Sequence, residues 1–165
     1  QNFTAYTGLD ALTHAIEAYV SNRASVLSDH FAIEAIKVIG KALPRVYKNG
    51  NDVDARQEML LASCYAGIAF TNSSTNLCHA TARPLGAQFN IPHGLSVALL
   101  HPYVIEFGSD GCKERYTHIV RVLNGNPHLS DDGAVEKLIN AIKKIHEKTP
   151  IWGTAARLHN INNKL

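Results

Sequence analysis

The sequence has little of what would mark several common classes of protein. Its three cysteines, Cys64, Cys78 and Cys112, are an odd number without CxxC spacing, which argues against a disulfide framework and a cysteine zinc site. No apolar run reaches the roughly 18 residues of a membrane span, and the first residues lack the order of a signal peptide. We therefore expect a reducing, cytoplasmic compartment and no membrane partner.

Charge of one sign is also scarce. The formal net charge is only +2, and no Lys/Arg-rich run with interleaved aromatic residues occurs, so a nucleic-acid partner is not expected. The sequence also lacks a glycine-rich strand-to-helix turn, so nothing in it could hold a pyrophosphate by itself. A hydrophobic fraction of 45% over 165 residues is instead typical of one packed globular domain.

The distribution of the apolar residues predicts an all-α fold, because they recur at three- and four-residue intervals and no useful strand alternation is found. The expected helices cover residues 8–21, 28–48, 52–70, 76–89, 95–108, 112–124 and 132–148. Thr7 or Gly8 is expected near the start of the first, and Ser28 as the cap of the second. The third should be buried on most sides beyond Met59, and so lie at the domain centre, because the apolar residues there leave no polar face; they are Leu60, Leu61, Ala62, Ala66 and Ile68.

Two residues of the first helix are candidate metal ligands. Asp10 and His14 are four residues apart, so their side chains project from one helix face and could chelate one ion. The same spacing also fits an ordinary surface ion pair between an imidazole and a carboxylate, which would contribute little to the stability of the fold. This pair alone leaves both interpretations open.

Two further histidines could complete such a site. His79 lies early in the expected helix 76–89, and His93 follows 14 residues later in a turn beside Pro92 and Gly94. Taken singly, the first could be a hydrogen-bonded core residue and the second an exposed turn residue. Together with Asp10 and His14 they supply one carboxylate and three imidazoles, a set suited to divalent Zn, Fe or Ni.

Two segments carry a resemblance to a known family. Residues 7–21 (TGLDALTHAIEAYVS) and 76–104 (NLCHATARPLGAQFNIPHGLSVALLHPYV) resemble the two hallmark regions of the iron-containing (type III) alcohol dehydrogenases. The resemblance covers at least residues 7–108. It implies that Asp10, His14, His79 and His93 surround one divalent metal ion, iron in the first place, with zinc or nickel open.

The resemblance further implies a two-domain enzyme. Residues 1–165 would be its multi-helix, dehydroquinate-synthase-like C-terminal domain, truncated at its C-terminal end, and an N-terminal domain outside this chain would bind NAD or NADP. The reaction would be reversible hydride transfer between NAD(P)(H) and an alcohol or aldehyde, with the metal polarising the substrate oxygen. The fragment alone is expected to be inactive, and the full protein to be a homo-oligomer. Phe70 matches the family's phenylalanine near the nicotinamide, or is a core aromatic.

One position departs from the family pattern. Many members have a second histidine four residues after the one that matches His79, and this chain has Arg83 there. An arginine releases no proton at useful pH, so we hypothesise that Arg83 orients an anionic group of the substrate or cofactor; a structural ion pair is the alternative. Two other functions stay open: a glycerol-dehydrogenase-like relative, and an inactive helical binding module that keeps the metal as a structural staple.

Overall fold

The structure, a computed structural model, describes residues 2–128, 130 and 133–148. Within these ranges every regular element is a helix, which confirms the all-α prediction, and the three cysteines are free. The helices are α1 (Asn2–Tyr19), α2 (Val26–Lys48), α3 (Val53–Thr71), α4 (Leu77–Phe89), α5 (His93–Gly108), α6 (Lys113–Asn124) and α7 (Ala134–Lys148). No helix in the described part is long and apolar enough to span a bilayer.

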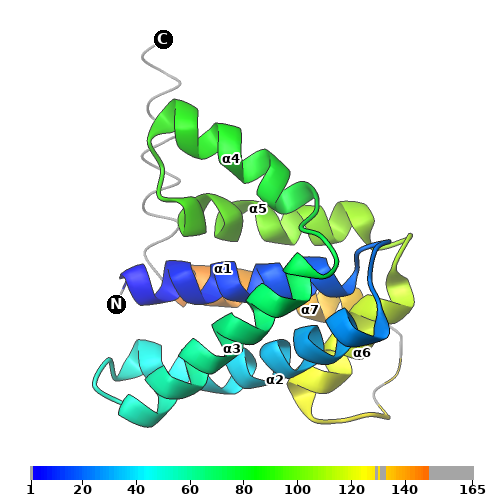
Figure 1. Ribbon diagram of the computed structural model, residues 1–165, viewed down its shortest axis with the longest axis horizontal. Helices are drawn as coiled ribbons and strands as arrows, with labels where there is room; N and C mark the ends of the chain where they lie inside the picture. Colours follow the sequence, from blue (N-terminus) through cyan, green and yellow to red (C-terminus); the bar gives the residue numbers. More distant parts are fainter. Residues whose placement is uncertain (1, 129, 131–132, 149–165) are drawn as a thin grey trace.

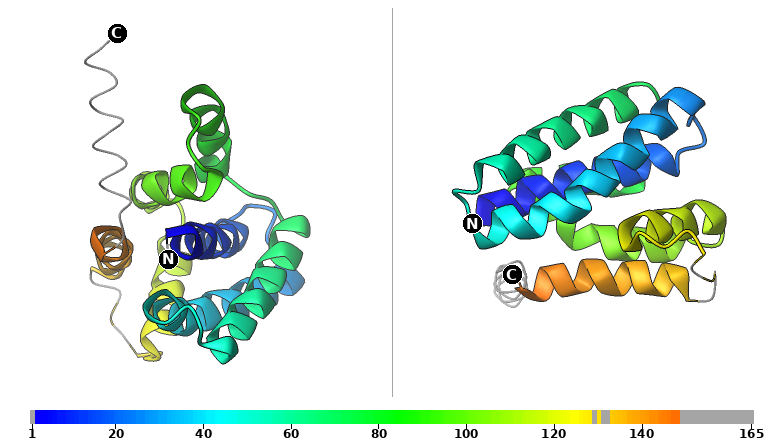
Figure 2. Two further views of the ribbon diagram at one scale, coloured as in Figure 1. Left: turned by 90° about the vertical axis from the view of Figure 1, so that its left-hand side faces the viewer. Right: turned by 90° about the horizontal axis from the view of Figure 1, so that it is seen from below.

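Helix α1 lies in the middle of the domain. It contacts α2, α3 and α5, while α4 packs on α5, and α7 packs on α5 and α6. Figure 1 shows α4 and α5 on one side of α1 and α2 and α3 on the other, and Figure 2 shows α1 nearly end-on between them. Residues on α1 can therefore meet residues from several other helices.

Helix α1 begins earlier than the sequence predicted. Helix α1 starts at Asn2, not near Thr7 or Gly8. Gly8 lies inside the helix, where a Cβ atom would be 2.4 Å from Cδ1 of Leu43 on α2. The glycine therefore allows two helices to approach closely. From the sequence alone, a glycine in this role cannot be distinguished from a glycine at a helix end. Leu9 and Ile16 of the same helix are fully buried, and the burial of each side chain stabilises the fold by roughly 1.5–3 kcal/mol.

The predicted cap of α2 is also three residues out of place. The N-cap is Ser25, whose side chain accepts a hydrogen bond from the Ser28 backbone, while the Ser28 hydroxyl accepts one from the Ser25 backbone. This reciprocal pair forms a capping box. Both serines favour a helix start, and the sequence alone did not separate their two roles.

The prediction that α3 is buried on most sides is wrong. Leu60 and Leu61 have 75% and 48% of their surface exposed. The helix buries only a stripe of small residues, namely Ala55, Ala62, Ala66 and Ala69. Because alanine allows two helix axes to approach closely, α3 packs on α1 and α2 through this stripe and leaves Leu60 and Leu61 outside.

Candidate metal centre

A stripe of three ionisable residues on α1 forms one wall of the candidate site. Asp10, His14 and Glu17 follow one another at intervals of four and three residues, so they share one face of the helix. Sequence reasoning selected the first two and missed Glu17. The i, i+4, i+7 spacing was a signal that could have found it.

The carboxylate of Asp10 is the point where the predicted ligands meet. Its Oδ1 atom lies 3.3 Å from Nε2 of His79, 3.6 Å from Nε2 of His93 and 3.9 Å from Nδ1 of His14. The ligand atoms of Asp10, His14 and His79 all lie within 4.8 Å of one another. Three helices, α1, α4 and α5, therefore bring the four predicted residues to one place.

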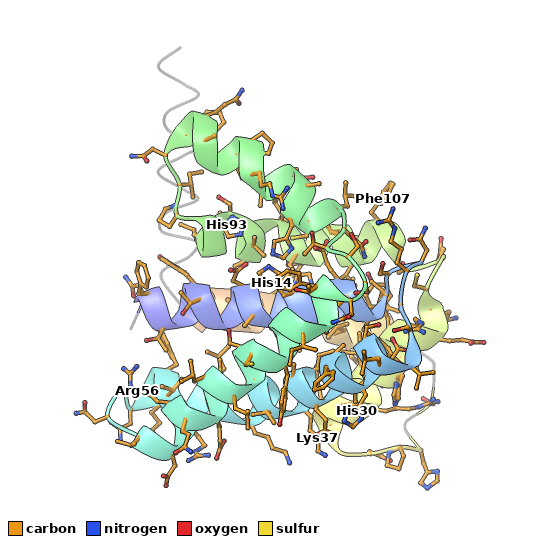
Figure 3. All side chains as sticks on the ribbon, viewed as in Figure 1. His14, His30, Lys37, Arg56, His93 and Phe107 are labelled. Carbon is orange, nitrogen blue, oxygen red and sulfur yellow. The ribbon has the colours of Figure 1, made fainter. Side chains whose placement is uncertain are left out.

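His93 reaches this place because α5 begins against the backbone of α1. Helix α4 ends at Asn90, which has the left-handed φ of 51°, and Pro92 is the N-cap of α5. A Cβ atom on Gly94 would lie 2.6 Å from the carbonyl oxygen of Tyr6, so only glycine permits this approach. His93 is thus the first residue of the helix rather than part of the predicted turn, and Figure 3 shows it and His14 on the facing sides of α5 and α1.

Glu17 lies behind His79 and holds it from the other side. Its Oε2 atom accepts a hydrogen bond of 2.6 Å from Nδ1 of His79 and one of 2.9 Å from the backbone of Asn76. Its Oε1 atom accepts one of 2.7 Å from the backbone of Cys78. The side chains of Glu17 and His79 are each only 3% exposed, so this network is closed to solvent.

The charges of the site follow from these contacts. Burial opposes the charged form of His79, but the hydrogen bonds and negative charges of Asp10 and Glu17 outweigh it and raise the His79 pKa to about 9. Burial, together with the nearby His79, lowers the pKa of His14 to about 4. Burial would raise the pKa of Asp10, yet its hydrogen bond with His79 and the surrounding imidazoles hold that pKa below its usual value. Without a metal, the positive charge therefore lies on His79.

Exposure increases from the back of the site to its front. His79 is almost fully buried, Asp10 and His14 are each 21% exposed, and His93 is 47% exposed. A group bound among them would be held on its inner side and accessible on the side of His93. Solvent therefore reaches the His93 side of the cluster, and a catalytic metal site requires one such accessible side for a further ligand.

Phe70 lies beside the site on α3. Its ring stacks on the ring of His14 with 4.6 Å between centroids and an interplanar angle of 25°. The ring of His79 also stacks on the ring of His14, with 4.0 Å between centroids. The structure therefore gives Phe70 a contact that was not foreseen, which fixes the orientation of the His14 ring.

Arg83 lies on α4 one turn after His79, on the same face of the helix. Its side chain is exposed, and no hydrogen bond or ion pair joins it to any residue in the described ranges. The predicted alternative of a structural ion pair thus finds no partner there.

The donor set fits a divalent transition metal. One carboxylate and two imidazoles, those of Asp10, His14 and His79, form a close group, the His93 imidazole adjoins Asp10 on the exposed side, and His79 is oriented by a second carboxylate. Together, the helical fold and this cluster are typical of a metal-binding helical domain.

Comparison with known proteins identifies the family. The model of the Fe-containing alcohol dehydrogenase family, C-terminal, matches residues 4–164, and the chain belongs to this family. The predicted resemblance is therefore confirmed.

Individual proteins that the chain resembles are also alcohol dehydrogenases. The chain is 49% identical over 142 residues to the probable alcohol dehydrogenase EutG of Escherichia coli, covering 86% of this chain and 35% of that protein. It is 43% identical over 150 residues to the NADPH-dependent butanol dehydrogenase of Clostridium saccharobutylicum, covering 90% and 37%. The solved structure of an alcohol dehydrogenase from Oenococcus oeni aligns with a TM-score of 0.82 and 38% identity, over 87% of this chain and 38% of that one. The chain thus spans 35–38% of the length of these relatives.

Proposed function

We propose that this chain is the metal-binding helical domain of an NAD(P)-dependent alcohol dehydrogenase. The observation that carries the proposal is the meeting of Asp10, His14, His79 and His93 around one carboxylate oxygen. Membership of the Fe-containing alcohol dehydrogenase family supports it. The reaction would be reversible hydride transfer between NAD(P)(H) and an alcohol or aldehyde.

The four residues would hold one divalent metal, with iron the first expectation and zinc or nickel open. Such an ion, when bound, supplies Lewis-acid polarisation of a substrate oxygen. The chain itself holds two of the ligands in the protonation state that binds a metal. His14 is neutral because of its burial, and Asp10 is ionised because of its imidazole neighbours. His93 stands at the open side, where a substrate oxygen would enter.

The dinucleotide would be bound mainly by an N-terminal domain, which these 165 residues do not include. The much greater length of the relatives supports this division. Phe70, whose ring packs on His14, would lie near the nicotinamide of the bound dinucleotide. A cytoplasmic location and a homo-oligomeric full protein remain predictions.

Arg83 would bind an anionic group of the substrate or of the cofactor. Its exposure and its lack of a partner in the described residues support this role. In the enzyme with its nucleotide domain, Arg83→Ala should raise KM about tenfold or more for either a carboxylate-bearing aldehyde or NADPH. Arg56→Ala, an exposed arginine on α3, is the control. Equal kinetics of Arg83→Ala and wild type with all of these substrates would contradict the role.

The proposal is tested by metal analysis and an NAD(P)H-linked aldehyde assay after the N-terminal domain is supplied. Wild type should keep about one divalent ion per chain and oxidise NADH or NADPH. Asp10→Asn and His14→Ala should lose both properties, because a ligand set reduced from four to three binds the ion much more weakly. His30→Ala, an exposed histidine on α2, should keep both. A wild-type enzyme that binds the ion but reacts with no aldehyde would point to a structural staple and refute the dehydrogenase.

A further inference from the structure

We infer that Glu17 is a positioning residue of the metal centre, which fixes His79 so that Nε2 faces Asp10 while Nδ1 donates to the Glu17 carboxylate. The inference deepens the proposed function and rests on it. Glu17 binds no metal in this account and acts only through His79.

The carboxylate of Glu17 faces only hydrogen-bond donors. Its two oxygens accept from the Nδ1–H of His79 and from two backbone N–H groups, those of Asn76 and Cys78. A carboxylate has only acceptor atoms, whereas a glutamine in its place must turn its NH₂ group toward one of these donors. The environment of Glu17 therefore requires an ionised carboxylate rather than any polar side chain of that size.

Glu17 also determines the tautomer of His79. With the proton on Nδ1 committed to Glu17 at 2.6 Å, the nitrogen left for a metal is Nε2, the atom 3.3 Å from Asp10. A histidine ligand that donates its other N–H to a carboxylate has a fixed ring orientation and a more basic metal-binding nitrogen. Glu17 thus selects the one nitrogen that points into the site.

The same carboxylate sets the position of α4. Asn76, the N-cap of α4, makes no side-chain cap hydrogen bond of its own. Glu17 instead receives the first backbone N–H groups of the helix, and the Asn76 side chain donates to the Glu17 carbonyl at 2.8 Å. A negative charge at a helix N-terminus is favourable. Helix position and ligand orientation therefore depend on one residue of α1.

The test is Zn²⁺ binding by the full 165-residue chain, measured by competition with a chromophoric chelator. Glu17→Gln should bind Zn²⁺ about 10- to 100-fold more weakly than wild type, the range for loss of such a partner. The matched control is Glu58→Gln, which loses an exposed carboxylate paired with Arg45 away from the site. Glu58→Gln should bind Zn²⁺ as wild type does.

A purely structural role makes a different prediction. If Glu17 only capped α4, Glu17→Gln would lower the stability of the metal-free chain but keep wild-type Zn²⁺ affinity, and this result would overturn the inference. Absence of Zn²⁺ binding by wild type would instead refute the proposed metal centre, and the inference with it. The two failures are thereby distinguished.

A second measurement needs no substitution of Glu17 and serves if that variant does not fold. Long-range ¹H–¹⁵N correlation of the histidine rings in wild type plus Zn²⁺ reports which nitrogen carries the proton, with His79 assigned by comparison with His79→Gln. The expected pattern is a protonated Nδ1 and a metal-bound Nε2. A metal-bound Nδ1 on His79 would overturn the inference.

Discussion

Replacement of Gly94 by alanine tests whether the approach of α5 to α1 builds the site. A Cβ atom at this position would lie 2.6 Å from the carbonyl oxygen and 2.8 Å from the carbonyl carbon of Tyr6. Both atoms belong to the backbone and cannot be relieved by a rotamer change, so the start of α5 must move away. Overpacking of this kind costs about 1–3 kcal/mol, and the movement carries the neighbouring His93 away from Asp10.

Gly67→Ala provides a matched control for this substitution. Gly67 lies inside α3, and a Cβ atom there would meet no heavy atom within 4 Å. The same exchange of glycine for alanine should therefore stabilise the chain by up to about 1 kcal/mol through helix propensity. The free energies of unfolding in urea should differ by about 1–4 kcal/mol between the two variants, with wild type between them.

A second assay connects the packing to the metal site. Gly94→Ala should lower the Zn²⁺ affinity of the folded chain, because His93 is displaced, while Gly67→Ala should leave it unchanged. The reasoning would be refuted if Gly94→Ala were as stable as Gly67→Ala and bound Zn²⁺ like wild type.

Two further predictions follow from the charges of the structure. At pH 7, Zn²⁺ binding should release about one proton from His79, because the pKa of His79 is raised to about 9. His14, with a pKa of about 4, should release none. The Zn²⁺ affinity should therefore rise about tenfold per pH unit up to about pH 9. Calorimetry in buffers of different ionisation enthalpy measures this release, and a heat independent of buffer would contradict it. Arg115→Ala should destabilise the chain by about 1 kcal/mol, because Arg115 pairs with Asp29 through two hydrogen bonds of 2.9 Å and also donates to the Tyr19 carbonyl. Urea unfolding measures the loss, and a change no larger than that of exposed Arg56→Ala would contradict it.

Much of the fold follows from local patterns in the sequence. The helices come from apolar residues at three- and four-residue intervals, and their order agrees with the structure throughout the described residues. What the pattern could not predict is which face of an evenly apolar helix is buried. On α3 the alanines face inward and Leu60 and Leu61 stay exposed, and this choice of face depends on how the helix packs on α1 and α2.

The candidate site was predictable only where its residues are close in the sequence or match the family pattern. Asp10 and His14 are near neighbours on one helix, and the family resemblance adds His79 and His93. Glu17 was missed because its role depends on the start of α4 lying against α1, a contact between residues about 60 positions apart, as in the bond from Cys78 to Glu17 with a separation of 61. The stack of Phe70 on His14 likewise arises only when α3 packs on α1.

The most direct test of the metal centre is a crystal of the chain grown with Co²⁺, with anomalous diffraction recorded at the cobalt edge. The account predicts one strong peak among Asp10, His14, His79 and His93, with Nε2 of His79 among its ligands. A fully occupied peak elsewhere on the chain, or these four side chains paired among themselves in the presence of saturating Co²⁺, would contradict it.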